Sequence, residues 1–224
     1  RADGAIYEFE EKPPVPKSQT ASMGIYLFRW SVLRQFLIQD EADPASENDF
    51  GKNVIPAMLN AGCRLYAYSF NNYWKDVGTI QSLWEANMDL LGSEPAFDLG
   101  GKNRIYARNS AMPAARLSET SETSNCFVAE GSEIGGCVHN SIISIGCTIE
   151  AGAVVENIVI MPEVRIEAGA VIKNAIIGEG CVIGRGAQVG AAQLLPPGEA
   201  RKIAVIGKDH HIEPNSLVKP GEVI

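Results

Sequence analysis

The chain has 224 residues, of which 46% are hydrophobic and 21% charged, a balance typical of a folded protein with one or two domains. Its 27 acidic and 19 basic residues give a net charge of −8. Because the sequence holds neither a long Lys/Arg run nor an apolar stretch near the roughly 20 residues of a membrane helix, we expect neither a nucleic acid nor a membrane as partner.

The first part of the chain alternates strand-like and helix-like segments. Three segments rich in aromatic and β-branched residues predict strands, at residues 5–10, 23–28 and 64–70. Apolar residues at helical spacing predict three helices, at residues 31–40, 50–60 and 79–91. Gly62 is the glycine expected after the end of the second helix. Strands and helices that take turns indicate an α/β layer structure.

The second part has a short repeat without helical periodicity. Segments that begin at Val138, Val155 and Ile172 align at a common spacing of 17 residues. Four columns of this alignment hold only Asn, Ile or Gly, and aliphatic residues recur every five or six positions within each segment. This spacing predicts a parallel β-helix, in which each coil makes three short strands and glycines turn the corners. The final segment, IAVIGKDHHIEPNSLVKPGEVI, is expected to add the strands that close the β-helix.

Two columns of the repeat have a structural interpretation. Asn140, Asn157 and Asn174 predict a ladder of side-chain hydrogen bonds at one corner, with a catalytic role as the alternative. Cys147 and Cys181 share a column with a valine and are expected to fill the interior as small apolar groups. The five cysteines include no C-x-x-C pair, which argues against a disulfide framework or a zinc site and fits a reducing cytoplasm.

Four motifs resemble those of bacterial ADP-glucose pyrophosphorylases, the glucose-1-phosphate adenylyltransferases. They are, in chain order, FEEKP, ASMGIYLF, DFGKNVIP and YWKDVGT. The resemblance implies a partial, Rossmann-like α/β nucleotidyltransferase domain followed by a left-handed parallel β-helix of hexapeptide-type repeats. We expect the first domain over residues 1–92, a linker over 93–124 and the β-helix over 125–224.

The resemblance also implies an activity. These enzymes join ATP and glucose 1-phosphate into ADP-glucose and pyrophosphate for glycogen synthesis. The family's glycine-rich nucleotide loop, with its catalytic basic residue, has no counterpart in this sequence. We therefore expect the chain to be the C-terminal portion of such an enzyme, inactive by itself, with the catalytic residue and the second metal-binding carboxylate upstream.

Five residues match positions of the family's sugar-phosphate and metal sites. Lys12 corresponds to the lysine that grips the phosphate of glucose 1-phosphate, and Glu11 to the acid that hydrogen-bonds the sugar. Ser22 matches a serine of the glucose pocket, and Trp74 would either wall that pocket or pack under the sheet. Asp76 matches an aspartate that holds Mg²⁺, a metal that prefers such oxygen ligands. Judged without the resemblance, Asp76 could equally cap the helix that follows it.

A basic cluster in the linker is a candidate effector site. Lys102, Arg104, Arg108 and, further on, Arg116 could bind a sugar-phosphate allosteric effector, because such anions need basic partners. The alternative is an ordinary solvated linker. The resemblance further implies a homotetramer in the cytoplasm.

Other functions stay open beside the adenylyltransferase. One is a non-catalytic regulatory subunit of the same enzyme, although Glu11, Lys12 and Asp76 are all present. Another is a sibling pyrophosphorylase that uses GTP, UTP or dTTP. A hexapeptide acyltransferase would need a β-helix histidine as general base. The histidines, His139 and the pair at positions 210 and 211, are expected at the surface, and no long loop is expected to project from a coil.

Overall fold

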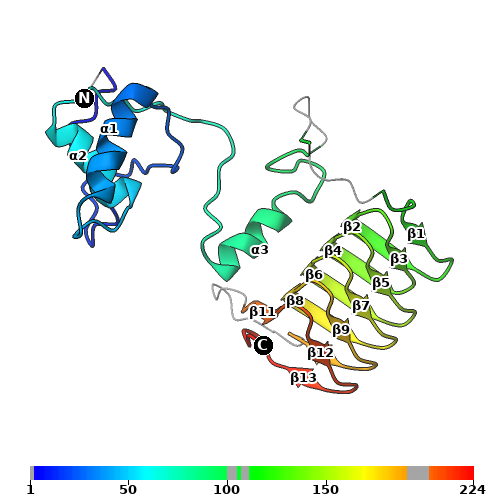
Figure 1. The fold of residues 1–224 in the computed structure, drawn as a ribbon. Helices are drawn as coiled ribbons and strands as arrows, with labels where there is room; N and C mark the ends of the chain where they lie inside the picture. Colours follow the sequence, from blue (N-terminus) through cyan, green and yellow to red (C-terminus); the bar gives the residue numbers. More distant parts are fainter. Residues whose placement is uncertain (1–2, 100–104, 107–110, 191–201) are drawn as a thin grey trace. The chain divides into compact units, whose positions relative to one another are not determined.

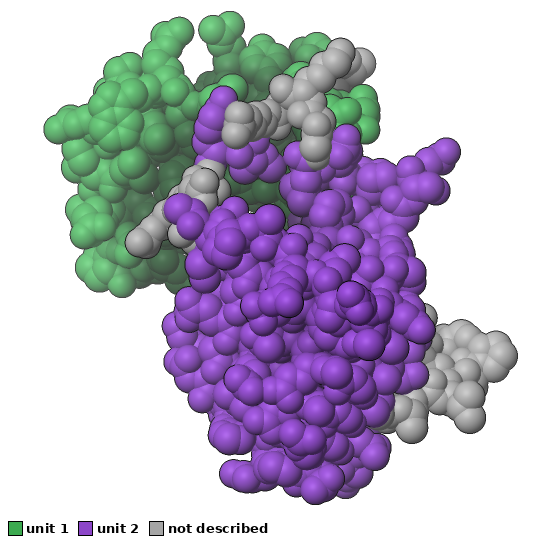
Figure 2. Space-filling view, turned by 90° about the vertical axis from the view of Figure 1, so that its right-hand side faces the viewer, with its two compact units in different colours: residues 1–74 green, residues 75–224 purple. Residues whose placement is uncertain are grey.

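The structure is a computed structural model that describes residues 3–99, 105–106, 111–190 and 202–224. The chain divides into two compact units, residues 1–74 and residues 75–224, coloured green and purple in Figure 2. The helix expected over residues 79–91 thus falls in the unit that contains the coils. The domain boundary that the sequence predicts after residue 92 stays a prediction.

The first unit contains the two helical regions that the sequence predicts. Helix α1 spans Trp30–Glu41, and a single π-helical segment, η1 (Phe50–Val54), leads into helix α2 (Ile55–Asn60). The side chain of Asp49 caps η1 by accepting a hydrogen bond from the backbone N–H of Lys52 at 2.8 Å. Gly62 follows α2 with a positive φ of 75°, as expected for the glycine that ends a helix.

The three strands expected in this unit are not formed. Residues 5–10, 23–28 and 64–70 form no strand, and their described β pairing consists of one antiparallel bridge between Ala5 and Tyr66. Many of their large side chains are exposed, among them Leu27, whose side chain is fully accessible. A strand needs a hydrogen-bonded neighbour, so local β propensity was not sufficient to make a sheet here.

The second unit contains a β-helix, seen as stacked coils in Figure 1. In the earlier coils, seven-residue strands alternate with two-residue strands, the last strands are all short, and all neighbours are parallel. One sheet has the order β13 (Leu217–Val218), β10 (Gln188–Val189), β8 (Val171–Ile177), β6 (Val154–Ile160), β4 (Cys137–Ile143) and β2 (Glu122–Val128). The other has the order β1 (Arg116–Leu117), β3 (Glu133–Ile134), β5 (Thr148–Ile149), β7 (Arg165–Ile166), β9 (Val182–Ile183) and β12 (His211–Ile212).

The strand register follows the predicted 17-residue repeat. Val138 pairs with Val155, which in turn pairs with Ile172. Ile149, Ile166 and Ile183 form a second such column. The parallel solenoid is consistent with the predicted left-handed β-helix. The final strands also form as expected, with β12, β13 and β11 (Ala204–Ile206).

The interior of the β-helix is a single dry core of stacked aliphatic side chains. Most of its members are 0–1% exposed, including the predicted pair Cys147 and Cys181. Each fully buried aliphatic side chain contributes roughly 1.5–3 kcal/mol. The stability of this unit therefore comes mainly from the repeated inward column that the sequence displays.

The predicted asparagine ladder forms between Asn140 and Asn157, and it extends one coil further than expected in the other direction, to Asn125. The Nδ2 atom of Asn125 donates to Oδ1 of Asn140 at 2.6 Å, and Nδ2 of Asn140 donates to Oδ1 of Asn157 at 2.7 Å. All of these residues, and Asn174, have a positive φ between 47° and 58°. Asn tolerates this left-handed conformation better than other non-glycine residues. The ladder thus combines a sharp corner with hydrogen bonding between coils.

Helix α3 (Ile80–Met88) packs against the side of the β-helix (Figure 1). Trp84 is 7% exposed, and it packs with Val159, Ile176 and Ile203. Its indole Nε1 donates a hydrogen bond to the backbone oxygen of Asn157 at 2.9 Å. Both an apolar contact and a directed hydrogen bond therefore fix α3 on the coils.

One row of the β-helix is interrupted. Strands β10 and β11 both pair with β8, so the chain leaves the row after Gly190 and has returned by Ala204. The stretch between Gly190 and Ala204 therefore separates two parts of one coil. The segment LLPPGEARK within this stretch, for which the sequence predicts a loop, lies outside the described residues except for its final Lys202.

Candidate functional site

Glu11 and Lys12 form the turn that carries the predicted sugar-phosphate contacts. Lys12 has a positive φ of 44°, and its side chain is 90% exposed. The Lys12 ammonium lies 3.5 Å from Oε1 of Glu11, which is itself only 27% exposed. A loose ion pair of this kind is weak in water. The Lys12 side chain is therefore available to an anionic ligand.

The carboxylate of Glu11 lies against the turn at the start of η1. Gly51 is buried there, and a Cβ atom at this position would collide with the Glu11 carboxylate and approach Oδ1 of Asp49 to 3.3 Å. Only glycine leaves room for this approach. Two acidic side chains thus converge near the backbone of Gly51, with Lys52 nearby as a counter-charge.

The Ser22 segment reaches the same turn through aromatic side chains. The Ser22 hydroxyl lies 2.9 Å from the hydroxyl of Tyr26 and accepts a hydrogen bond from the Gly24 backbone N–H at 3.1 Å. The Tyr26 ring stacks on Phe50, with ring centres 6.0 Å apart and an interplanar angle of 16°. The structure therefore connects three of the four motifs that carried the resemblance, FEEKP, ASMGIYLF and DFGKNVIP.

Along the chain, Trp74 and Asp76 lie on either side of the division between the units. Trp74 is half-exposed at the end of the first unit, whereas Asp76 belongs to the second. Oδ1 of Asp76 accepts a hydrogen bond from the Gly78 backbone N–H at 2.9 Å. The helix cap is Thr79, which forms a capping box with Ser82, so Asp76 does not cap α3.

The described residues contain no group of three or more His, Cys, Asp or Glu side chains arranged to hold a metal ion. Asp76 offers one carboxylate, a ligand that suits a hard divalent cation such as magnesium. Nucleotidyltransferases in general use divalent metal ions, with phosphate oxygens among the ligands. Asp76 thus fits as one ligand of such an ion, and not as a complete site.

The candidate effector residues Lys102, Arg104 and Arg108 lie outside the described residues. Arg116 is described, and it is exposed in β1. It lines a shallow groove of about 420 Å³ on the β-helix, together with Glu133, Thr148 and Glu150. Acidic side chains thus line the same groove as Arg116, the one member of the predicted basic cluster among the described residues.

The histidines have local partners. Nδ1 of His139 lies 2.7 Å from the Ser124 hydroxyl, and Nδ1 of His210 lies 3.1 Å from the backbone oxygen of Lys208. His210 and His211 are exposed, as expected, and His139 is intermediate. These contacts do not resemble a general base that faces a substrate pocket.

Three side chains at the η1 turn, which the Glu11 carboxylate approaches, were not among the residues predicted for the site. Asp49 and Phe50 belong to that turn and Tyr26 stacks on Phe50, whereas the sequence shows them only as members of the motifs DFGKNVIP and ASMGIYLF. The motifs that contain these residues could be recognised in the sequence, but only the fold shows that these motifs lie close to FEEKP.

Comparisons with known proteins match both parts of the chain. Residues 1–93 match the family model described as nucleotidyl transferase, and residues 112–195 match the model described as GlmU-like, C-terminal hexapeptide. A glucose-1-phosphate adenylyltransferase of Clostridium botulinum (strain Alaska E43 / Type E3) is 50% identical over 150 residues, which cover 66% of this chain and 39% of that protein.

Two further relatives have the same name. The protein of Clostridium perfringens (strain SM101 / Type A) is 54% identical over 145 residues, covering 64% of this chain and 37% of the relative. That of Acetivibrio thermocellus is 43% identical over 195 residues, covering 87% of this chain and 46% of the relative. The chain is homologous to glucose-1-phosphate adenylyltransferases. It spans less than half the length of these adenylyltransferases. Among the residues that the structure describes, no helix combines the length and the apolar character needed to cross a bilayer.

Proposed function

We propose that the natural protein is a glucose-1-phosphate adenylyltransferase, which forms ADP-glucose and pyrophosphate from ATP and glucose 1-phosphate for glycogen synthesis. The observation that carries this proposal is the Glu11–Lys12 turn, packed against the Asp49–Lys52 turn in a chain homologous to these enzymes. An exposed cation next to converging carboxylates suits a ligand that has both a phosphate and several hydroxyl groups.

Each predicted site residue has a role in this reaction. Lys12 would bind the phosphate of glucose 1-phosphate, while Glu11 and Ser22 would hydrogen-bond the sugar and Trp74 would wall the pocket. Asp76 would be one ligand of Mg²⁺. Attack of a sugar phosphate on the α-phosphorus of ATP needs positioned substrates and offset negative charge more than covalent help from the protein. The residues of this chain would position glucose 1-phosphate and offset negative charge.

The substrate assignment is tested with the natural protein and glucose 1-phosphate against a panel of ATP, GTP, UTP and dTTP. We expect a clear preference for ATP. A preference for another nucleotide would instead identify a sibling pyrophosphorylase, and no turnover with any nucleotide would favour a regulatory subunit.

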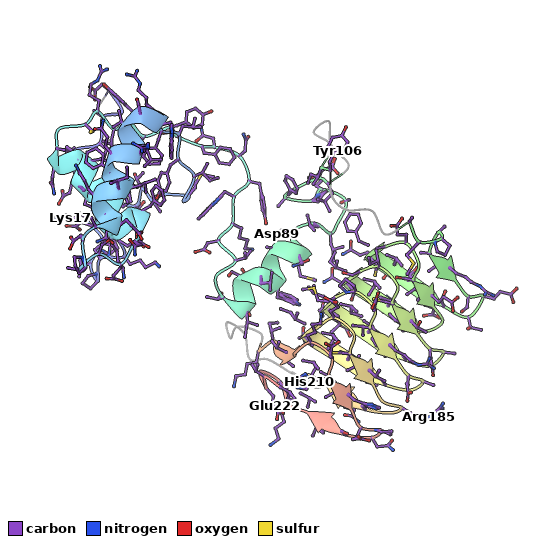
Figure 3. All side chains as sticks on the ribbon, viewed as in Figure 1. Lys17, Asp89, Tyr106, Arg185, His210 and Glu222 are labelled. Carbon is purple, nitrogen blue, oxygen red and sulfur yellow. The ribbon has the colours of Figure 1, made fainter. Side chains whose placement is uncertain are left out.

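The role of Lys12 is tested by substitution. Removing a charged hydrogen-bond donor costs about 1.5–3 kcal/mol, so Lys12→Ala should raise the KM for glucose 1-phosphate roughly ten- to hundredfold. Lys17→Ala is the matched control in the same unit, because Lys17, labelled in Figure 3, is already paired with Glu8 and Glu10. Equal effects of the two substitutions would contradict the assignment.

The cellular setting and the regulation belong to the same proposal. A cytoplasmic protein agrees with the five cysteines, all of which are free thiols. We propose a homotetramer regulated by a sugar phosphate that binds Lys102, Arg104 and Arg108. Replacing Arg104 and Arg108 with alanine should abolish the response to the effector. An unchanged activation curve would contradict the proposed effector site.

A further inference from the structure

Lys75 lies between Trp74 and Asp76, two of the predicted site residues, but its side chain is directed at helix α3. Nζ of Lys75 lies 2.8 Å from Oδ2 of Asp89 and 3.3 Å from Oε2 of Glu85. Asp89 is the C-terminal cap residue of α3, where Figure 3 labels it. The Lys75 side chain is only 25% exposed, so this ion pair is less screened than one at the open surface.

The residues after Asp76 are tied to the opposite end of the same helix. The Asp76 carboxylate accepts from the Gly78 backbone N–H, and a Cβ atom at Gly78 would come within 3.2 Å of Oδ1 of Asp76. Thr79 then caps α3 through its reciprocal hydrogen bonds with Ser82. The segment 75–79 is therefore attached to α3 at both ends, with Asp76 in between.

Helix α3 is in turn attached to the β-helix. Trp84 buries its ring among Val159, Ile176 and Ile203 and donates its indole N–H to the backbone of Asn157. A second contact joins Nδ2 of Asn140, a member of the asparagine ladder, to the sulfur of Met88 at 3.8 Å. Coils, helix and segment 75–79 thus form one continuous set of contacts within the second unit.

We propose that Lys75 is a positioning residue for Asp76, and that the β-helix anchors the metal-binding segment through α3. The proposal rests on the proposed function, in which Asp76 is a ligand of the divalent metal. Lys75 itself touches neither metal nor substrate, because its ammonium is engaged by Asp89 and Glu85. Outer groups that hydrogen-bond a metal ligand typically change metal affinity ten- to hundredfold when they are replaced, and Lys75, which holds Asp76 only through the chain, is expected at the lower end of that range.

The test measures Mn²⁺ binding to the natural protein in the presence of ATP, by electron paramagnetic resonance of the free ion. Lys75→Met should raise the Kd for Mn²⁺ about tenfold, while Lys75→Arg, which keeps the ion pair, should stay near wild type. Asp89→Asn should weaken binding in the same direction. Because Lys75 and Asp89 act through one contact, the double variant should be no worse than Lys75→Met alone.

Kinetics give a second readout that general destabilisation would not produce. The metal concentration for half-maximal rate should rise in Lys75→Met, whereas the KM for glucose 1-phosphate should not change. Lys208→Met is the matched control, since Lys208 pairs with Glu179 at 3.0 Å elsewhere in the same unit. It should bind Mn²⁺ like the wild type.

Two outcomes separate this inference from the proposed function. If Asp76→Asn weakens Mn²⁺ binding but Lys75→Met does not, the positioning role of Lys75 is wrong and the function stands. If Asp76→Asn leaves Mn²⁺ binding unchanged, the metal role of Asp76 fails and the inference fails with it. A Lys75→Gln variant, which keeps a hydrogen-bond donor, serves in place of Lys75→Met if that variant does not fold by circular dichroism.

Discussion

Each asparagine of the ladder contributes both a backbone conformation and a side-chain hydrogen bond. Asn157 has a φ of 58°, and its Oδ1 accepts from Asn140. Glycine can adopt the same φ without cost but has no amide, whereas alanine lacks the amide and is strained at this φ. The two substitutions therefore separate the two contributions.

We predict that Asn157→Gly lowers the free energy of unfolding by about 1 kcal/mol, the typical net value of one hydrogen bond. Asn157→Ala should cost a further 1–2 kcal/mol, approximately, because of the left-handed backbone. Urea unfolding followed by circular dichroism measures both values. Equal stability of the two variants would show that the corner imposes no backbone strain.

Burial makes three of the cysteines harder to ionise. Burial raises the pKa of Cys126, Cys147 and Cys181, despite opposing hydrogen bonds to backbone groups. A raised thiol pKa means less thiolate at a given pH, and the thiolate is the reactive form. Cys63 and Cys137 are less buried than the two core thiols, Cys147 and Cys181.

We therefore expect iodoacetamide at pH 8 to modify Cys63 and Cys137 well before Cys147 and Cys181, as mass spectrometry of timed samples would show. In urea, where burial is lost, all five thiols should react at similar rates. Modification of Cys181 as fast as Cys63 in the native protein would contradict the buried position of its column.

At the scale of elements, α3 depends on Trp84 for its place on the β-helix. Trp84→Phe keeps most of the apolar contact but leaves the Asn157 carbonyl without the indole donor, which should cost about 1–3 kcal/mol. Trp84→Ala also removes the ring from its cluster and should cost about 3–5 kcal/mol. Thermal unfolding measures both, with half-exposed Trp74 as the control, where Trp74→Phe should change stability by less than about 0.5 kcal/mol.

The helices and strands also show which features of the fold could be predicted from the sequence. The coils were predictable because inward residues repeat at a spacing of 17 positions. Ile149, for example, pairs with Ile166 on the next coil, so the spacing in the sequence gives the register of the strands. The segments 5–10, 23–28 and 64–70 have suitable composition for strands, but composition does not supply a pairing partner. The cap of α3 was ambiguous for a similar reason, since Asp76 and Thr79 are both common cap residues and only backbone geometry selects Thr79.

The candidate site was predictable in its residue types but not in its assembly. Glu11 and Ser22 could be predicted as site residues from their motifs. The approach of Glu11 to Gly51, in contrast, depends on a π-helical turn that no sequence pattern predicted. The same holds for Lys75, whose partner Asp89 is 14 residues away and becomes a neighbour only because α3 lies between them.

At the scale of the whole molecule, the two units differ greatly in their cores. Among the described residues of the first unit, the buried apolar side chains are Val54, Ile55 and Met58. The core cluster of the β-helix contains more than twenty residues, stacked coil upon coil. Since burial of apolar surface is the main favourable term in folding, stability should be concentrated in residues 75–224.

We predict that a polypeptide of residues 75–224 alone unfolds cooperatively in urea, with a midpoint close to that of the 224-residue chain. Residues 1–74 alone should bind the dye ANS and give poorly dispersed amide resonances, because three buried apolar residues cannot offset the conformational entropy of a chain of that length. Sharp, dispersed spectra from residues 1–74 would overturn this division of stability. Loss of cooperative unfolding in residues 75–224 would instead show that the coils depend on the first unit.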